Sequence, residues 1–170
     1  MMMDEKLASF EALCRREYPL VVRTAYLITG DAEEAADVAQ EAFARALQHW
    51  RKVRRMDRPA AWLQRVAANL SISWRRRGRY WSREIAAEPE GVEDRDPSNG
   101  LLMLEALQLL TPAQRAAIVL RYYADQSVEQ AARALGKRPG TIRALTSQGF
   151  TRLRAYLADD EQEELDALRD

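Results

Sequence analysis

The chain has little of what disulfide-bonded, metal-binding and membrane proteins require. Its 170 residues include one cysteine, Cys14, and one histidine, His49. A single cysteine excludes an internal disulfide, and these two residues are too few for a metal site or a cysteine–histidine catalytic pair. No apolar run approaches about 18 residues, so we expect no membrane span. No basic segment followed by an apolar one stands at the start, so we expect no export and a reducing cytoplasm.

The net charge of zero conceals five segments of alternating sign. Basic and acidic side chains number 4 and 9 in residues 1–44, and 12 and 1 in residues 45–83. They number 1 and 7 in residues 84–105, 8 and 2 in residues 106–157, and 1 and 7 in residues 158–170. Repulsion within the first basic segment costs stability unless a partner supplies negative charge. The two basic segments indicate two surfaces for one polyanion, although two solvated helical faces would give the same counts.

Apolar residues in the first half recur at helical spacing, and no segment of the chain has the alternation of a strand. Gly30 ends a first helix, and Asp31 caps a second, with Glu34 completing a capping box. A third helix is expected to begin near Pro59, with Asp57 as its N-cap. Three such amphipathic helices can enclose one small core.

The second half follows an acidic segment rich in proline and glycine, which predicts a flexible linker. Two capping boxes, at Thr111–Gln114 and Ser127–Gln130, predict two helices, the first continuing through Tyr122. Gly136 can end the second in the left-handed conformation, and Pro139 begins a long last helix. The predicted fold is all-α, with two small helical domains at residues 1–82 and 101–158, the linker at 83–100 and an acidic tail at 159–170.

A short helix, a tight turn with glycine and a longer helix form the helix-turn-helix arrangement, in which the second helix enters the major groove. Arginine and glutamine can bind base edges, and alanine and threonine methyls can contact thymine. A plain helical hairpin would have a similar pattern. The side chains expected to point outward are Lys137, Arg138, Thr141, Arg143, Ala144, Ser147 and Gln148.

Two faces of the first half carry candidate binding residues. Asp37, Gln40 and Glu41 share one face of the second helix, where a merely solvated surface is the alternative. The third helix combines aromatic residues with Arg65, Asn69 and a basic cluster, a combination that suits unstacked bases and phosphates. Core packing is the favoured interpretation for Trp62, and a solvent-exposed position is the alternative for Asn69. The basic cluster includes Arg75, Arg76 and Arg77.

Taken together, the chain resembles a bacterial RNA polymerase sigma factor of the extracytoplasmic-function (ECF) group. GDAEEAADVAQEAFARALQHW and RPAAWLQRVAANLSISWRRR look like sigma region 2, and LTPAQRAAIVLRYYADQSVEQAARALGKRPGTIRALTSQGFTRLR looks like sigma region 4. The two motifs occur in the expected order around a linker. The resemblance implies transcription initiation at promoter DNA, core RNA polymerase and an anti-sigma factor as partners, and no cofactor, metal or catalytic residue.

The resemblance also implies roles for single residues. Asp37, Gln40 and Glu41 match a motif that docks on the clamp helices of the polymerase β′ subunit, and region 4 would meet the β flap. Arg65 and Asn69 match positions at the pocket for a flipped-out base of the −10 element, below a specificity loop at residues 49–57. Arg75, Arg76 and Arg77 match positions at which members of the family contact DNA phosphates near the −10 element. The outward residues from Lys137 to Gln148 match the face that reads the −35 element.

Two other functions agree with the pattern. A stand-alone helix-turn-helix regulator would bind duplex DNA tightly without polymerase, and an adaptor would bind proteins through both halves. An enzyme is not expected, because no nucleophile–base pair, phosphate loop or metal-ligand spacing occurs in the sequence. The acidic tail either extends the last helix or shields the basic surface of the second half.

Overall fold

The computed structural model describes the backbone of residues 2–76 and 97–167 and the side chains of residues 8–73 and 103–158. Within these ranges every regular element is a helix, which confirms the all-α prediction. We call residues 2–76 the N-terminal half and residues 97–167 the C-terminal half. Most of the predicted acidic linker, residues 83–96, lies outside the described residues.

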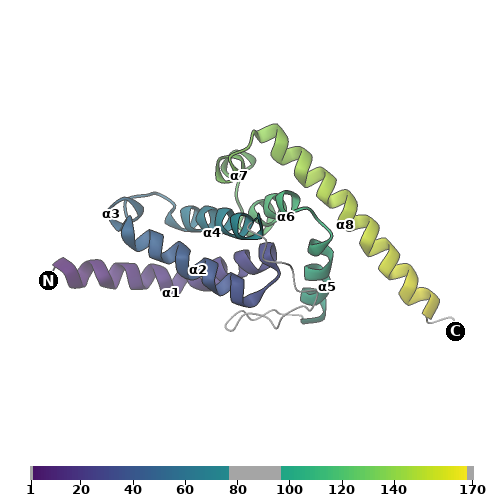
Figure 1. The fold of residues 1–170 in the computed structure, drawn as a ribbon, viewed down its shortest axis with the longest axis horizontal. Helices are drawn as coiled ribbons and strands as arrows, with labels where there is room; N and C mark the ends of the chain where they lie inside the picture. The colour runs from purple at the N-terminus through teal and green to yellow at the C-terminus, as the bar shows by residue number, and fades with distance from the viewer. Residues whose placement is uncertain (1, 77–96, 168–170) are drawn as a thin grey trace.

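The N-terminal half consists of three long helices and one short one (Figure 1). Each of α1, α2 and α4 packs against the other two, and their apolar stripes form the core. Gly30 ends α1 with a left-handed φ of 76°, and the Asp31 side chain accepts a hydrogen bond of 2.8 Å from the Glu34 amide. The elements are α1 (Met2–Thr29), α2 (Ala32–Gln48), α3 (Trp50–Val53) and α4 (Pro59–Arg76).

Five helical segments form the C-terminal half, and α8 packs on α5, α6 and α7. Both predicted capping boxes are present with their reciprocal hydrogen bonds, and Gly136 ends α7 at φ 61°. The helix α8 continues to Ala167, so its backbone extends into the acidic tail as one of the two interpretations expected. The elements are α5 (Pro97–Gln108), α6 (Pro112–Ile118), η1 (Val119–Tyr123), α7 (Val128–Leu135) and α8 (Pro139–Ala167).

Three local predictions were wrong. The first helical hydrogen bond of α4 runs from the Trp62 amide to the Arg58 carbonyl, so Arg58, and not Asp57, occupies the cap position. The α-helix opened by Thr111 stops at Ile118 and continues as the π-helix η1, which leaves Tyr122 59% exposed. The helix α5 begins at Pro97, within the segment assigned to the linker.

The two halves pack against each other, which the sequence did not predict. In Figure 1, α6 and α7 lie along α4, and α1 and α4 both contact α6 and η1. Hydrogen bonds between described residues join the halves. The Asn69 side chain donates to the Ala134 carbonyl at 2.7 Å, and the Arg115 guanidinium donates to the Ile28 carbonyl at 2.9 Å. The structure is therefore a closed arrangement of the two halves.

Candidate nucleic-acid interface

The face of α8 that the helix-turn-helix pattern predicted is exposed along its whole length. All seven predicted residues are exposed, while Ala131 and Ala132 on α7 and Ile142 on α8 are buried between the two helices. The left-handed conformation of Gly136 turns the chain sharply between α7 and α8, and the amide of Lys137 donates to the Ala132 carbonyl at 2.9 Å. This surface, the −35 face, comprises Lys137, Arg138, Thr141, Arg143, Ala144, Ser147 and Gln148.

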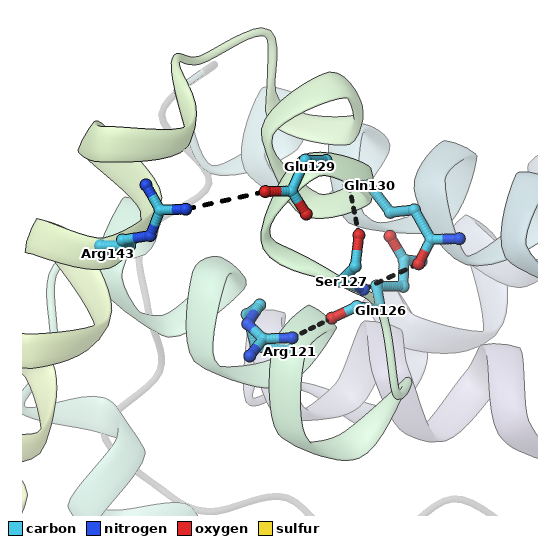
Figure 2. A network of polar contacts seen from close by, with 6 residues as sticks. All are labelled: Arg121, Gln126, Ser127, Glu129, Gln130 and Arg143. Carbon is cyan, nitrogen blue, oxygen red and sulfur yellow. Dashed lines mark hydrogen bonds and ion pairs between the residues drawn. The ribbon is translucent and has the colours of Figure 1, made fainter.

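Polar contacts fix part of the −35 face to the helices behind it. The Arg143 guanidinium lies 3.7 Å from the Glu129 carboxylate of α7, as Figure 2 shows. The backbone amide of Glu129, the Ser127 hydroxyl and, more weakly, Arg143 hold the pKa of the Glu129 carboxyl below its usual value. The Gln148 side chain accepts a hydrogen bond of 3.4 Å from Gln114 of α6. The −35 face thus offers donors in a defined arrangement, and one of its cations has an acidic neighbour.

A second network of hydrogen bonds, shown in Figure 2, holds the start of α7. The amide of Gln130 donates to the Ser127 hydroxyl at 3.1 Å, and the Ser127 amide donates to the Gln130 side chain at 2.7 Å. The Arg121 guanidinium of η1 donates to the Gln126 carbonyl. These contacts satisfy backbone groups that a helix start leaves unpaired, and they fix the position of α7 relative to the π-helix.

The predicted docking face on α2 is accessible. Asp37 and Gln40 are exposed, and the Glu41 carboxylate accepts a hydrogen bond of 2.8 Å from Arg45 one turn later. The opposite face of α2 is buried against α1 and α4, with Val38, Ala42 and others in the core. This separation of an acidic outer face from an apolar inner face leaves the three residues free to contact a partner.

The candidate single-strand face on α4, which we call the −10 face, comprises Trp62, Arg65 and Asn69. Arg65 is exposed, Trp62 and Asn69 are half-buried, and all three lie on successive turns of α4. Trp62 and Arg65 line a cavity of about 180 Å³ together with Arg133 and two glutamines of the C-terminal half. Trp62 also packs against the core, as expected, and the predicted residues Arg65 and Asn69 lie on neighbouring turns of α4, next to α7.

The basic cluster after α4 is only partly described. Arg75 and Arg76 belong to the last turn of α4, whereas Arg77 lies outside the described residues. The loop predicted at residues 49–57 contains the short helix α3, which begins at Trp50. His49 is exposed at the end of α2, as expected, and the Trp50 ring packs edge-on against Phe10 at 5.3 Å.

The sequence pattern gave no indication that Arg115 is a buried structural residue. This side chain is 1% exposed and donates hydrogen bonds to the carbonyls of Leu107, Gln108, Leu110 and Ile28. It therefore ties the end of α5 and the end of α1 to α6. No signal in a single sequence distinguishes this arginine from a solvated one, because most arginine side chains in proteins are exposed.

The described residues offer no group of three or more metal-ligating side chains, and none of the described helices is long and apolar enough to cross a membrane. Cys14 is half-buried on α1. Burial, and to a lesser extent the neighbouring Glu11, raise the pKa of its thiol, so the reactive thiolate is disfavoured.

The fold and the faces define a two-part helical protein with one helix-turn-helix surface and one aromatic–basic surface. Residues 13–80 match the family Sigma-70 region 2, and residues 101–153 match Sigma-70, region 4. An RNA polymerase sigma-E factor of Streptomyces antibioticus is 30% identical over 169 residues, covering 98% of this chain and 92% of that protein. The ECF RNA polymerase sigma factor SigL of Mycobacterium tuberculosis is 34% identical over 160 residues, covering 89% and 90%.

A solved structure agrees with these matches. The sigma factor RpoE of Bartonella quintana, crystallised with the anti-sigma factor NepR, superposes with a TM-score of 0.72 at 25% identity, covering 88% of this chain and 97% of that one. The chain belongs to the ECF sigma factors of bacterial RNA polymerase. Its function is to direct transcription initiation at promoters, and the matches do not favour a stand-alone regulator.

Proposed function

We propose that the chain binds core RNA polymerase and contacts two promoter elements through different helices. The observation that carries this proposal is the complete exposure of the −35 face on a helix braced by buried Ala131, Ala132 and Ile142. A rigid helix with exposed arginine, glutamine and threonine side chains can place donors and methyl groups against base edges in the major groove. We assign the −35 duplex to this face.

The −10 face would bind the melted strand. An asparagine amide can hydrogen-bond a base edge, an indole ring can stack on a base, and arginines can contact phosphates. Trp62, Arg65 and Asn69 present these three chemistries along one side of α4. Base flipping costs a few kcal/mol, which stacking and hydrogen bonds on this face would offset. We further assign phosphate contacts near the −10 element to Arg75, Arg76 and Arg77.

Polymerase docking is assigned to Asp37, Gln40 and Glu41. Asp37 and Gln40 are exposed and Glu41 is half-buried, which leaves this face available to the clamp helices of the β′ subunit. The C-terminal half would contact the flap of the β subunit. The acidic segment at residues 83–100 would connect the sigma region 2 domain at 1–82 to the sigma region 4 domain at 101–158. RNA synthesis itself belongs to the polymerase, and the site of action is the cytoplasm.

An anti-sigma factor is the second proposed protein partner. The Bartonella quintana sigma factor was crystallised with one, and this chain superposes on it over most of its length. A protein of that class would regulate this chain by covering faces that polymerase or DNA must reach.

The direct test adds the pure chain to core RNA polymerase and a library of random duplex sequences, and then sequences the RNA start points. We expect RNA synthesis to start downstream of two recurrent sequence elements. Asp37→Ala with Glu41→Ala should reduce co-purification with core polymerase, and Asn69→Ala should impair initiation while leaving co-purification intact. Tight duplex binding without polymerase and no initiation would instead indicate a stand-alone regulator. No DNA footprint even with polymerase would indicate an adaptor.

A further inference from the structure

One side chain of the −35 face, Gln148, is contacted by a buried residue behind it. Gln114 on α6 is 4% exposed, and its Nε2 donates to Oε1 of the exposed Gln148 at 3.4 Å. A glutamine amide carries one acceptor oxygen and one NH2 group with two donor hydrogens. When its oxygen is directed at Gln114, the NH2 group of Gln148 is the part of the amide that can meet a base.

The direction of this hydrogen bond follows from the two groups at the other end of the Gln114 amide. The Thr111 backbone amide and the Arg152 guanidinium each donate to Oε1 of Gln114 at 3.2 Å. A backbone N–H and a guanidinium can donate but cannot accept. A reversed Gln114 amide would place its NH2 group against both of these donors. The oxygen of Gln114 therefore faces Thr111 and Arg152, its NH2 group faces Gln148, and Gln148 must accept.

The backbone of α8 lies close to α6 beside this contact. Gly149 is buried, and a Cβ atom at this position would lie 2.6 Å from Cδ1 of Ile118 and 3.7 Å from Cβ of Gln114. Glycine therefore permits the close approach that brings its neighbour Gln148 within reach of Gln114. The capping box with Thr111 holds Gln114 itself in place.

We propose that Gln114 is a positioning residue for base recognition, which holds the Gln148 amide with its NH2 group toward DNA and so selects a base that presents an acceptor. This proposal rests on the proposed function of the −35 face. In the major groove, guanine presents N7 and O6 and thymine presents O4 as acceptors, whereas cytosine presents only the N4 donor. We expect guanine or thymine to be favoured over cytosine at one position by about fivefold, the ratio that one neutral hydrogen bond produces.

The test compares base frequencies in the duplexes of the random library from which core polymerase and each variant initiate. Gln148→Ala identifies the position, because the preference there should disappear. Gln114→Glu keeps an acceptor for Thr111 and Arg152, and glutamate is a standard residue at this place in a capping box. Since a carboxylate only accepts, Gln148 should turn its NH2 group toward residue 114 and its oxygen toward DNA. The preference should reverse toward cytosine at that position and stay the same at the others.

Two further variants separate this effect from a general change in charge or fold. Gln130→Glu makes the same substitution in the capping box of α7 and should leave the preference unchanged. Gln114→Met has no amide, so it should release Gln148 and bring guanine and cytosine to equal frequency. Circular dichroism verifies that each variant is folded.

The outcomes distinguish this proposal from the function on which it rests. Folded Gln114→Glu and Gln114→Met chains that keep the base preference of the original chain overturn the proposal. A base preference that Gln148→Ala leaves unchanged at every position overturns it as well. Initiation without any base preference upstream of the −10 element refutes the assigned function of the −35 face, and this proposal with it.

Discussion

The −35 face of α8 and the −10 face of α4 differ in what covers them. Every residue of the −35 face is exposed, and its polar contacts with Glu129 and Gln114 lie within the C-terminal half. On the −10 face, Asn69 is half-buried and donates a hydrogen bond to Ala134 in the other half of the chain. The −35 face can meet a duplex without rearrangement, whereas the −10 face requires the halves to part.

The difference also concerns the kind of DNA that each face is assigned. Reading a duplex needs a rigid helix with its donors preset, which the α7–α8 packing supplies. The −10 face is needed only after polymerase has opened the promoter and melted the strand. Covering the −10 face before that step therefore does not weaken recognition of the −35 duplex. The packing between the halves is consequently the feature that most of the following substitutions test.

The largest expected effect tests whether the halves form one cooperative unit. Leu63 in the N-terminal half and Ile142 in the C-terminal half are both 0% exposed, so replacing either with alanine should lower the free energy of unfolding by about 3 kcal/mol. The sequence has no tryptophan in the C-terminal half, whereas Trp50, Trp62 and Trp74 belong to the N-terminal half, so a change in their fluorescence reports unfolding of that half. Ile142→Ala should nevertheless shift the urea transition seen by fluorescence.

The exposed Leu109 serves as the control for these two substitutions, since Leu109→Ala should change the free energy of unfolding by less than about 0.5 kcal/mol. A fluorescence transition unmoved by Ile142→Ala, with the circular dichroism transition shifted, would mean that the halves unfold independently.

Arg115→Met should come next, lowering the free energy of unfolding by about 3 kcal/mol, because it removes several buried hydrogen bonds to backbone carbonyls at once. Urea denaturation measures the loss. The matched control is Arg154→Met on the exposed surface of α8, which should be close to neutral. Equal stability of the two variants would show that the guanidinium contacts contribute nothing to the closed arrangement.

Arg143→Ala should have an intermediate effect, which is confined to DNA binding. Loss of one base-reading arginine costs about 1–3 kcal/mol in binding and relaxes sequence preference at one position. Fluorescence anisotropy with a −35 duplex selected from the library, at fixed salt, measures this. Arg154→Ala, which removes the same charge outside the −35 face, should weaken binding less and equally for all sequences. Identical behaviour of the two variants would remove Arg143 from the recognition surface.

The smallest effect is expected from Glu129→Gln, which removes the acidic neighbour of Arg143 and keeps the side-chain size. Duplex affinity should rise by no more than about fivefold, because the ion pair is exposed. Since the folded-state pKa of Glu129 is lowered, its contribution to stability is present above the unfolded-state pKa and is lost as pH falls through the folded-state value. A pH titration of the free energy of unfolding should therefore show a smaller acid-side loss in Glu129→Gln, and an unchanged loss would contradict the lowered pKa of Glu129.

Local signals in the sequence predicted much of this structure, because they act over a few residues. The capping boxes at Thr111 and Ser127 and the left-handed Gly136 all have the predicted geometry. The exposed −35 face follows from helical periodicity in the same way. The roles assigned to the faces remain predictions that the experiments above test.

Long-range packing was not predictable from the same signals. The Asn69–Ala134 contact joins residues 65 positions apart, and an asparagine within a helix gives no indication of its partner. Arg115 is buried although arginine is rarely so, because four carbonyls at helix ends converge on it only in the folded chain. The π-helix at Val119–Tyr123 likewise lies between the halves, where η1 contacts α1 and α4 of the N-terminal half.

The most direct test of the account is photo-cross-linking from both faces within one initiation complex. A cysteine-attached photoreactive group is placed at Arg65 on α4 or at Ala144 on α8, in a Cys14→Ser chain bound to core polymerase and a selected promoter. We expect Arg65→Cys to cross-link to the melted strand near −10. We expect Ala144→Cys to cross-link to the duplex near −35, which lies about 25 base pairs, or about 85 Å, upstream. Cross-links from both positions within the same few base pairs, or from neither, would contradict it.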